Sequence, residues 1–389
     1  MENRKINICC YLLFGLLFII MLSVYGYGVY FLKNLSLSYV GIGTTMAISA
    51  LLSSILQPVL GRIADTYHYP WQRILIILNL IVIISILSMF IIPKQYSYLM
   101  FALMVIASGC MYPFIIYSPF YYEHHGIKTN FGASRGFGAL TFTVFALIIG
   151  FSLSDMNFMI IPLFPLASSI MMILFVHLLP DYGYKDNFDK RDFRKNIFSK
   201  YPVFTLFLVS LIFLMTFQNL FECYMINIIE NVGGNISNVG ISNSLAAVLE
   251  LPVMFFFLKI LDKVEAKKLI IMASLFYIVR SLMICFAQDI VAIYLSQILQ
   301  MLTFAVIVPA SVHLTNDLIE DNDQYEAQAF LGATVTVGLI LANFIGGNVL
   351  QLYGIDVLLL ALVLLTVLGS VFALIAMAFN DKIKHVEKV

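Results

Sequence analysis

Apolar stretches long enough to cross a bilayer recur along almost the whole chain, and they constrain its fold more than any other feature. A membrane-spanning helix needs about 20 mostly apolar residues, and twelve segments meet that requirement. They lie at approximately 8–31, 38–60, 72–92, 96–120, 133–153, 157–179, 202–229, 237–260, 267–287, 290–314, 327–352 and 355–379. Most connections are very short, so consecutive helices must be antiparallel. We therefore expect an all-α membrane protein with twelve transmembrane helices in a lipid bilayer.

The composition supports a membrane environment. Only 11% of the 389 residues are charged and 61% are hydrophobic, whereas an ordinary soluble domain carries about 25% charged residues. The formal net charge is zero, so nothing indicates a nucleic-acid partner. The sequence contains no phosphate-binding loop, metal-ligand spacing or nucleophile motif. We accordingly expect no cofactor, no metal and no enzymatic activity.

One long polar connection, from Pro180 to Lys200, divides the predicted helices into six and six. The sequence thus predicts an N-terminal half at 1–180, a cytoplasmic linker at 181–200 and a C-terminal half at 201–389. Two six-helix halves with nested inverted repeats are the layout of the major facilitator fold. A trace of duplication is the Pro-Val pair that begins at Pro58 in helix 2 and at Pro252 in helix 8. We expect a central cavity between the halves.

The distribution of Lys and Arg predicts the orientation, because cytoplasmic loops are enriched in these residues. With the N-terminus inside, Lys33 and Lys94 lie outside and Arg280 lies within the membrane, while the remaining nineteen of the 22 basic residues lie inside. We expect a plasma-membrane protein with both termini in the cytoplasm. The loop after helix 10 is acidic and has no basic residue, but acidic residues contribute little to topology.

Three ionisable residues fall at membrane depth, where a charge costs about 2.5–3.5 kcal/mol on insertion scales. They are Glu222, Glu250 and Arg280. Glu250 and Arg280 belong to adjacent antiparallel helices and can therefore meet. One interpretation is a buried structural ion pair. The other is a carboxylate whose protonation is coupled to transport, because burial and a nearby arginine act on it in opposite directions.

Two polar stripes leave alternatives open. Glu222 has Gln218 and Asn219 beside it on a helical period, and it faces either a cavity or interfacial water. In helix 10, polar side chains recur every third residue and share one face, where they either join helices or line a cavity. These residues are Gln297, Gln300 and Thr303.

Four segments together carry a family resemblance. They are the loop signature Gln57-Pro58-x-x-Gly61-x-x-x-Asp65, the helix 5 entry at 131–138, Glu250-Leu251-Pro252 with Arg280, and the helix 10 segment at 297–304. In these segments the chain resembles the oligosaccharide:proton symporter branch of the major facilitator superfamily. Lactose permease is the best-known member of that branch, and the nucleoside and phenylpropionate permeases are related to it.

The resemblance implies roles for single residues. Arg135 would contact the substrate, and Phe142 occupies the position of a stacking aromatic residue in a sugar permease. Glu250 would join substrate binding to proton coupling, and Arg280 would ease its deprotonation. Gly61 and Asp65 would belong to a gating loop. We also predict Glu222 and Gln300 as substrate-binding residues.

The chain departs from the family pattern at several positions. Gln300 stands where the family has a histidine, Thr303 where lactose permease has an acid, and Val335 where a helix 11 lysine is usual. Thr66 and His68 replace a basic residue and a glycine of the loop signature. Lactose itself is therefore not the expected substrate, and proton coupling must rest on fewer groups.

The sequence predicts a monomeric secondary transporter that carries a small polar organic substrate together with protons. A sugar or oligosaccharide is the first choice of substrate. The alternatives are a nucleoside or aromatic-acid symporter and an efflux antiporter. A membrane sensor or scaffold would need a soluble domain, and the longest stretch outside the predicted helices is only the connection at 180–200.

Overall fold

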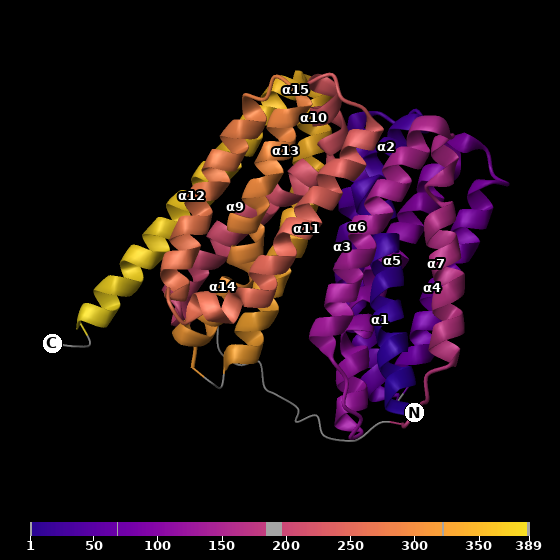
Figure 1. The fold of residues 1–389 in the computed structure, drawn as a ribbon, viewed down its shortest axis with the longest axis horizontal. Helices are drawn as coiled ribbons and strands as arrows, with labels where there is room; N and C mark the ends of the chain where they lie inside the picture. Colours follow the sequence, from indigo (N-terminus) through magenta and orange to yellow (C-terminus); the bar gives the residue numbers. More distant parts are fainter. Residues whose placement is uncertain (1, 68, 184–196, 321–322, 387–389) are drawn as a thin grey trace. The chain divides into compact units, whose positions relative to one another are not determined.

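The computed structural model describes residues 2–67, 69–183, 197–320 and 323–386, and this part of the chain is helical without strands (Figure 1). The chain forms two compact units. Unit 1 comprises Met1–Phe188 with Asn235–Ala247, and unit 2 comprises Asp189–Gly234 with Val248–Val389. Most of the predicted linker at 181–200 lies outside the described residues.

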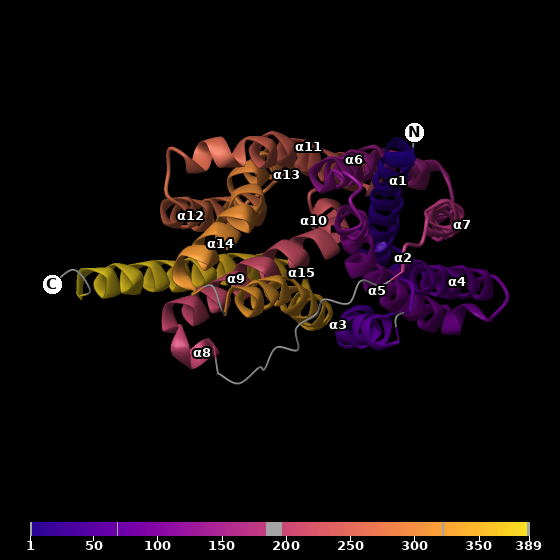
Figure 2. The ribbon, with the colours of Figure 1, turned by 90° about the horizontal axis from the view of Figure 1, so that it is seen from below.

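Unit 1 contains the first six crossings. The first crossing is interrupted by a π-helical turn, η1, and short 3₁₀ turns precede α5 and α7. The elements are α1 (Glu2–Met21), η1 (Leu22–Gly26), α2 (Gly28–Asn34), α3 (Tyr39–Thr66), α4 (Trp71–Met89), η2 (Lys94–Tyr96), α5 (Ser97–His124), α6 (Phe131–Asp155), η3 (Phe158–Ile160) and α7 (Leu163–His177). α5 packs against both α3 and α4 and lies between them (Figure 2).

Unit 2 contains most of the remaining crossings. Its elements are α8 (Ile197–Lys200), α9 (Pro202–Cys223), α10 (Met225–Asn231), α11 (Ile236–Leu261), α12 (Ala266–Cys285), α13 (Ile290–Ile298), η4 (Leu299–Leu302), α14 (Phe304–Leu318) and α15 (Gln324–Val386). α11 is shared, because its first part, up to Ala247, belongs to unit 1.

Small residues allow the first part of α11 to pack closely on α6 in unit 1. A Cβ on Gly150 would lie 2.8 Å from the Cα of Gly240. Ser244 donates a hydrogen bond to the carbonyl oxygen of Thr143 at 2.7 Å. Side chains larger than hydrogen at either glycine would force the two backbones apart.

The described residues contain eleven helical stretches long and apolar enough to cross a membrane, and the last of these, Ala327–Phe379, has 53 residues. At 1.5 Å per residue this stretch is far longer than the hydrocarbon thickness of about 30 Å. It bends at Gly354, whose φ of 78° favours glycine. α15 therefore supplies two crossings, and the described residues account for the twelve transmembrane helices that the sequence predicts.

Two predicted helices are interrupted at corresponding places in the chain. Tyr27 lies between η1 and α2 with φ −122° and ψ 1°, and Tyr224 lies between α9 and α10 with φ −102° and ψ 17°. Both side chains are fully buried. Tyr27 donates a hydrogen bond to the carbonyl oxygen of Ala146 at 2.8 Å, and Tyr224 donates to that of Asn343 at 3.2 Å. In each half, the first crossing is thus bonded to the fifth.

The acidic loop after α14 has a basic partner in unit 2. Lys200 donates to Glu320 and to Asp323, both at 2.7 Å, and Tyr201 donates to Asp323 at 2.9 Å. The hydrogen bonds from Lys200 to Asp323 and Glu320 raise the pKa of its ammonium group. Lys200, the last residue of α8, therefore partly offsets the negative charge of the loop that breaks the positive-inside pattern.

Candidate functional site

A polar cluster surrounds Arg280 in unit 2, and we call it the Arg280 cluster. Its members come from five elements, α9, α11, α12, α13 and η4, together with the residue after η4. They are Gln218, Glu222, Glu250, Arg280, Gln297, Gln300 and Thr303.

Arg280 lies at the centre of the cluster, and its side chain is fully buried. Its Nη1 donates to the amide oxygens of Gln218, at 3.0 Å, and of Gln300. Its Nη2 donates to the amide oxygen of Gln297 at 2.6 Å. The hydroxyl of Thr303 lies 3.4 Å from Nη1. Neutral amides therefore satisfy the part of the guanidinium that faces the cluster.

Two phenylalanine rings also lie close to the guanidinium. Its Cζ lies 5.3 Å from the ring centroid of Phe221 and 5.9 Å from that of Phe217. A cation within about 6 Å of an aromatic face is attracted by the ring quadrupole, most strongly when it is desolvated. These contacts help to offset the cost of burying the charge.

Two glutamines connect the arginine to the two glutamates. The Nε2 of Gln300 donates to Glu250 at 2.6 Å, and the Nε2 of Gln218 donates to Glu222. A guanidinium only donates hydrogen bonds, so each glutamine must turn its oxygen toward Arg280 and its nitrogen toward a carboxylate. The sequence predicts that Glu250 and Arg280 can meet, and the structure links them through Gln300.

The accessible side of the cluster presents acceptors. Arg280 is buried, whereas Glu250 is half-buried and Glu222 is exposed. Ionised carboxylates accept hydrogen bonds and do not donate them. With one buried cation and two accessible carboxylates, the cluster is suited to bind hydroxyl groups, a proton or a cation, and it repels an anion.

The polypeptide is irregular at the cluster, where the sequence predicts a continuous helix at 290–314. α13 gives way to the 3₁₀ turn η4, and Thr303 then has φ −107° and ψ −94°. The Thr303 hydroxyl donates to the carbonyl oxygen of Leu299 at 2.8 Å, a local bond that competes with helix geometry. Discontinuous membrane helices typically form the binding sites of secondary transporters.

The predicted site residues Arg135 and Phe142 belong to α6 in unit 1. Both are half-buried, and they lie two turns apart on the same helix. The ring of Phe142 packs edge-on against Phe18 of α1, with centroids 6.4 Å apart and an interplanar angle of 86°. The ring is thereby fixed in orientation and retains an accessible surface.

The predicted gating-loop residues lie toward the end of α3. A Cβ at Gly61 would meet no atom within 4 Å, so packing among the described residues does not require glycine there. The side chain of Asp65 lies outside the described part of the chain. Their role in gating stays a prediction.

Sequence reasoning did not select several members of the Arg280 cluster as site residues. Gln218, Gln297 and Thr303 all contact Arg280. The three-residue spacing in helix 10 and the position of Gln218 one turn before Glu222 were the available signals. Nothing in the sequence pattern pointed to Phe217 and Phe221, because two phenylalanines in an apolar helix are usually core residues.

Twelve membrane crossings and a polar cluster at membrane depth define an integral membrane transporter. The chain belongs to the MFS_1 like family, whose match covers residues 5–361. This assignment confirms the predicted relationship to the major facilitator superfamily and the expectation that the chain is not an enzyme.

Individual relatives agree with this assignment. The chain is 24% identical to the maltose permease of Geobacillus stearothermophilus over 367 residues, which cover 92% of this chain and 91% of that protein. Among solved structures, the nucleoside transporter NupG is 16% identical with a TM-score of 0.79, covering 97% of this chain and 98% of the other. A D-xylose-proton symporter is 13% identical with a TM-score of 0.74 and covers 97% of each chain. At these identities the solved structures show a shared fold.

Proposed function

We propose that the chain is a proton-coupled symporter for a neutral sugar or oligosaccharide. The observation that carries the proposal is the connection of Glu250 to the buried Arg280 through Gln300. A carboxylate held in this way at membrane depth is a group that can exchange a proton when the connection changes.

The substrate class follows from the charge of the Arg280 cluster. Its accessible carboxylates accept hydrogen bonds from hydroxyl groups, and its single arginine is already bonded to amides. This arrangement favours a polyhydroxylated neutral molecule over an aromatic acid. The similarity to a maltose permease supports a sugar. A nucleoside remains the second candidate, because the half-buried ring of Phe142 offers a stacking surface for a base.

Each site residue has a proposed role in the cycle. Glu250, Glu222 and Gln300 bind substrate hydroxyls, and Arg135 and Phe142 contribute contacts from unit 1. While Gln300 bonds Glu250, the positive charge of Arg280 favours the ionised carboxylate. A rearrangement that breaks this bond leaves desolvation dominant, and Glu250 takes up a proton. Substrate binds to the protonated state and leaves after deprotonation.

The membrane setting belongs to the same proposal. The transporter works as a monomer in the plasma membrane. Both termini lie in the cytoplasm, because the loops on that side are enriched in basic residues. The halves at 1–180 and 201–389 would move relative to each other in alternating access, with Gly61 and Asp65 in a gating loop.

Reconstitution into proteoliposomes tests the proposal. Labelled maltose, uridine and phenylpropionate are offered with the outside more acidic than the inside, and a protonophore serves as control. For one proton per substrate we expect accumulation of a neutral sugar by about tenfold per pH unit, abolished by the protonophore. Uptake that ignores the pH gradient, or export driven by inward proton flow, would overturn proton symport. Accumulation of uridine alone would select the second candidate.

A further inference from the structure

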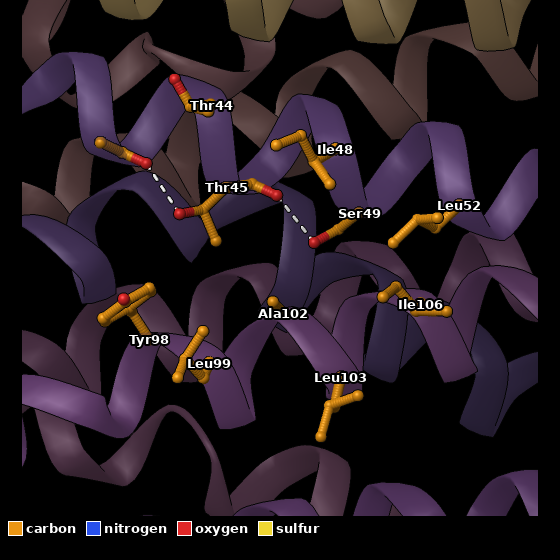
Figure 3. Close-up of a pocket in the computed structure, with 11 residues that line it drawn as sticks. Thr44, Thr45, Ile48, Ser49, Leu52, Tyr98, Leu99, Ala102, Leu103 and Ile106 are labelled. Carbon is orange, nitrogen blue, oxygen red and sulfur yellow. Dashed lines mark hydrogen bonds between the residues drawn. The ribbon is translucent and has the colours of Figure 1, made fainter.

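A groove along α3 and α5 of unit 1 plays no part in the proposed transport site. Its cavity volume is about 620 Å³, within the range of small-molecule sites. Figure 3 shows side chains of the two helices facing each other across it. The lining residues from α3 are Gly41, Thr44, Thr45, Ile48, Ser49 and Leu52, and those from α5 are Tyr98, Leu99, Ala102, Leu103 and Ile106.

The interior of the groove offers few unsatisfied hydrogen-bonding groups to an occupant. The Thr45 hydroxyl donates to the carbonyl oxygen of Gly41, and the Ser49 hydroxyl donates to that of Thr45, both at 2.7 Å (Figure 3). These hydroxyls are thus satisfied by their own helix. No lining residue is ionisable at neutral pH, so the chemistry of the groove is that of a hydrocarbon chain.

The rim of the groove is open at membrane depth. Ile48, Leu52, Leu99 and Leu103 are each between 41% and 51% exposed. α3 and α4 both pack on α5 but scarcely touch each other, so the surface of α5 beside α3 is not covered by the next helix of unit 1. Branched apolar side chains that stay exposed within unit 1 are suited to contact with acyl chains.

Two lysines belong to the segments that lead into the mouth of the groove. α3 and α5 both begin at this end, and Lys94 lies one turn before Tyr98. The ammonium group of Lys33 lies 5.8 Å from the ring centroid of Tyr39, the first residue of α3. An apolar groove that ends at two cations is complementary to a lipid with a negative headgroup.

We propose that the groove binds an anionic phospholipid, with an acyl chain between α3 and α5 and its phosphate held by Lys94 and Lys33. The start of each helix adds the positive end of its dipole to the same place. This site is separate from substrate binding, and it does not depend on the proposed transport function. Its consequence is selection of one lipid class from the surrounding bilayer.

Fluorescence quenching can test the site directly, because the chain has a single tryptophan. Trp71 is buried at the start of α4 and packs against Tyr121 and Tyr122, near the end of α5 remote from the groove.

In a Trp71→Phe background, Leu103→Trp places a reporter in the groove. Ile84→Trp is the matched control, because it is exposed on α4 at a similar distance from the helix end on the same side. Each variant is reconstituted in phosphatidylcholine vesicles with a small fraction of brominated phosphatidylglycerol or brominated phosphatidylcholine.

We expect brominated phosphatidylglycerol to quench the Leu103→Trp reporter more effectively than brominated phosphatidylcholine, by about fivefold for each lysine. Adding Lys94→Gln should reduce this preference by about fivefold, and Ile84→Trp should show none. Equal quenching of the groove reporter by both lipids, or a preference that survives Lys94→Gln with Lys33→Gln, would overturn the proposal. If Trp71→Phe does not fold, Trp71 is retained, and the signal of the parent chain, which has Trp71 alone, is subtracted for each lipid. Lipid binding is read without transport, so its failure is distinct from failure of the proposed function.

Discussion

The amide nitrogen of Gln300 donates a hydrogen bond to the carboxylate of Glu250 at 2.6 Å. The oxygen of the same amide accepts a hydrogen bond from Arg280. A neutral imidazole also offers one donor and one acceptor, so glutamine can make the same two connections as the histidine that the family resemblance implies at this position. Unlike histidine, glutamine does not titrate. In the proposed mechanism, proton exchange therefore occurs at a neighbouring carboxylate, and Gln300 serves as the connection.

Two substitutions of Gln300 test its role as a connector. Gln300→Glu can accept from Arg280 but cannot donate to an ionised Glu250, so we expect accumulation driven by a pH gradient to fall by at least about tenfold. Gln300→His supplies both a donor and an acceptor and should restore most of it. Both are measured in proteoliposomes under an imposed gradient. Normal accumulation by Gln300→Glu, or equal failure of the two variants, would contradict the role.

Glu250→Gln imitates a permanently protonated carboxyl group. We expect this variant to exchange substrate across the membrane at nearly the normal rate and to lose accumulation against a gradient. Exchange and accumulation are measured in the same proteoliposomes, with and without a pH gradient, and Glu222→Gln is compared in parallel. If Glu250→Gln still accumulates substrate, Glu250 is not the coupling group and Glu222 becomes the leading candidate.

Arg135→Lys tests whether this arginine contacts substrate or only anchors α6 at the cytoplasmic side. Lysine retains the charge but not the planar, bidentate donor geometry. For a substrate contact we expect transport at low substrate concentration to fall by at least about tenfold. Arg62→Lys, at an exposed position of α3, provides the control for an anchoring residue. Transport by Arg135→Lys that matches this control would exclude the contact.

Gly240→Ala tests the close packing of α11 on α6 within unit 1. The new Cβ would lie 3.0 Å from the Cα of Gly150 and would collide with the carbonyl oxygen of Ala146. We expect a loss of about 1–3 kcal/mol in stability, seen as a lower thermal midpoint when the buried cysteines become reactive on unfolding. Gly61→Ala is the control. Its Cβ would meet open space, and a helical alanine should be neutral or stabilise by up to about 1 kcal/mol. Equal midpoints for the two variants would show that the contact is not tight in solution.

The sequence predicted the crossings well because apolar length is a strong signal that each segment carries on its own. All twelve predicted spans correspond to helices, including the pair separated at Gly354. The interruptions at Tyr27, Tyr224 and Thr303 were not predicted. They depend on hydrogen bonds to other helices or to a side chain's own turn, and hydropathy contains no information about those partners.

The site was predicted less completely for a related physical reason. Charges at membrane depth are costly, so Glu222, Glu250 and Arg280 stood out one by one. Of the two glutamines that join them, the sequence analysis selected Gln300 but not Gln218, because an amide in a membrane helix more often bonds a neighbouring helix without further function. Only the geometry shows that Gln218 and Gln300 turn their oxygens toward the same guanidinium.

Tyr27 and Tyr224 occupy matching positions in the two halves of the chain. Each follows an interruption of the first helix of its half, and each bonds a backbone carbonyl of the fifth. A bond to a carbonyl places no requirement on the partner's side chain, so it can persist while the surrounding sequence diverges. The same brace at the same place in both halves is what the internal repeats of this fold would leave.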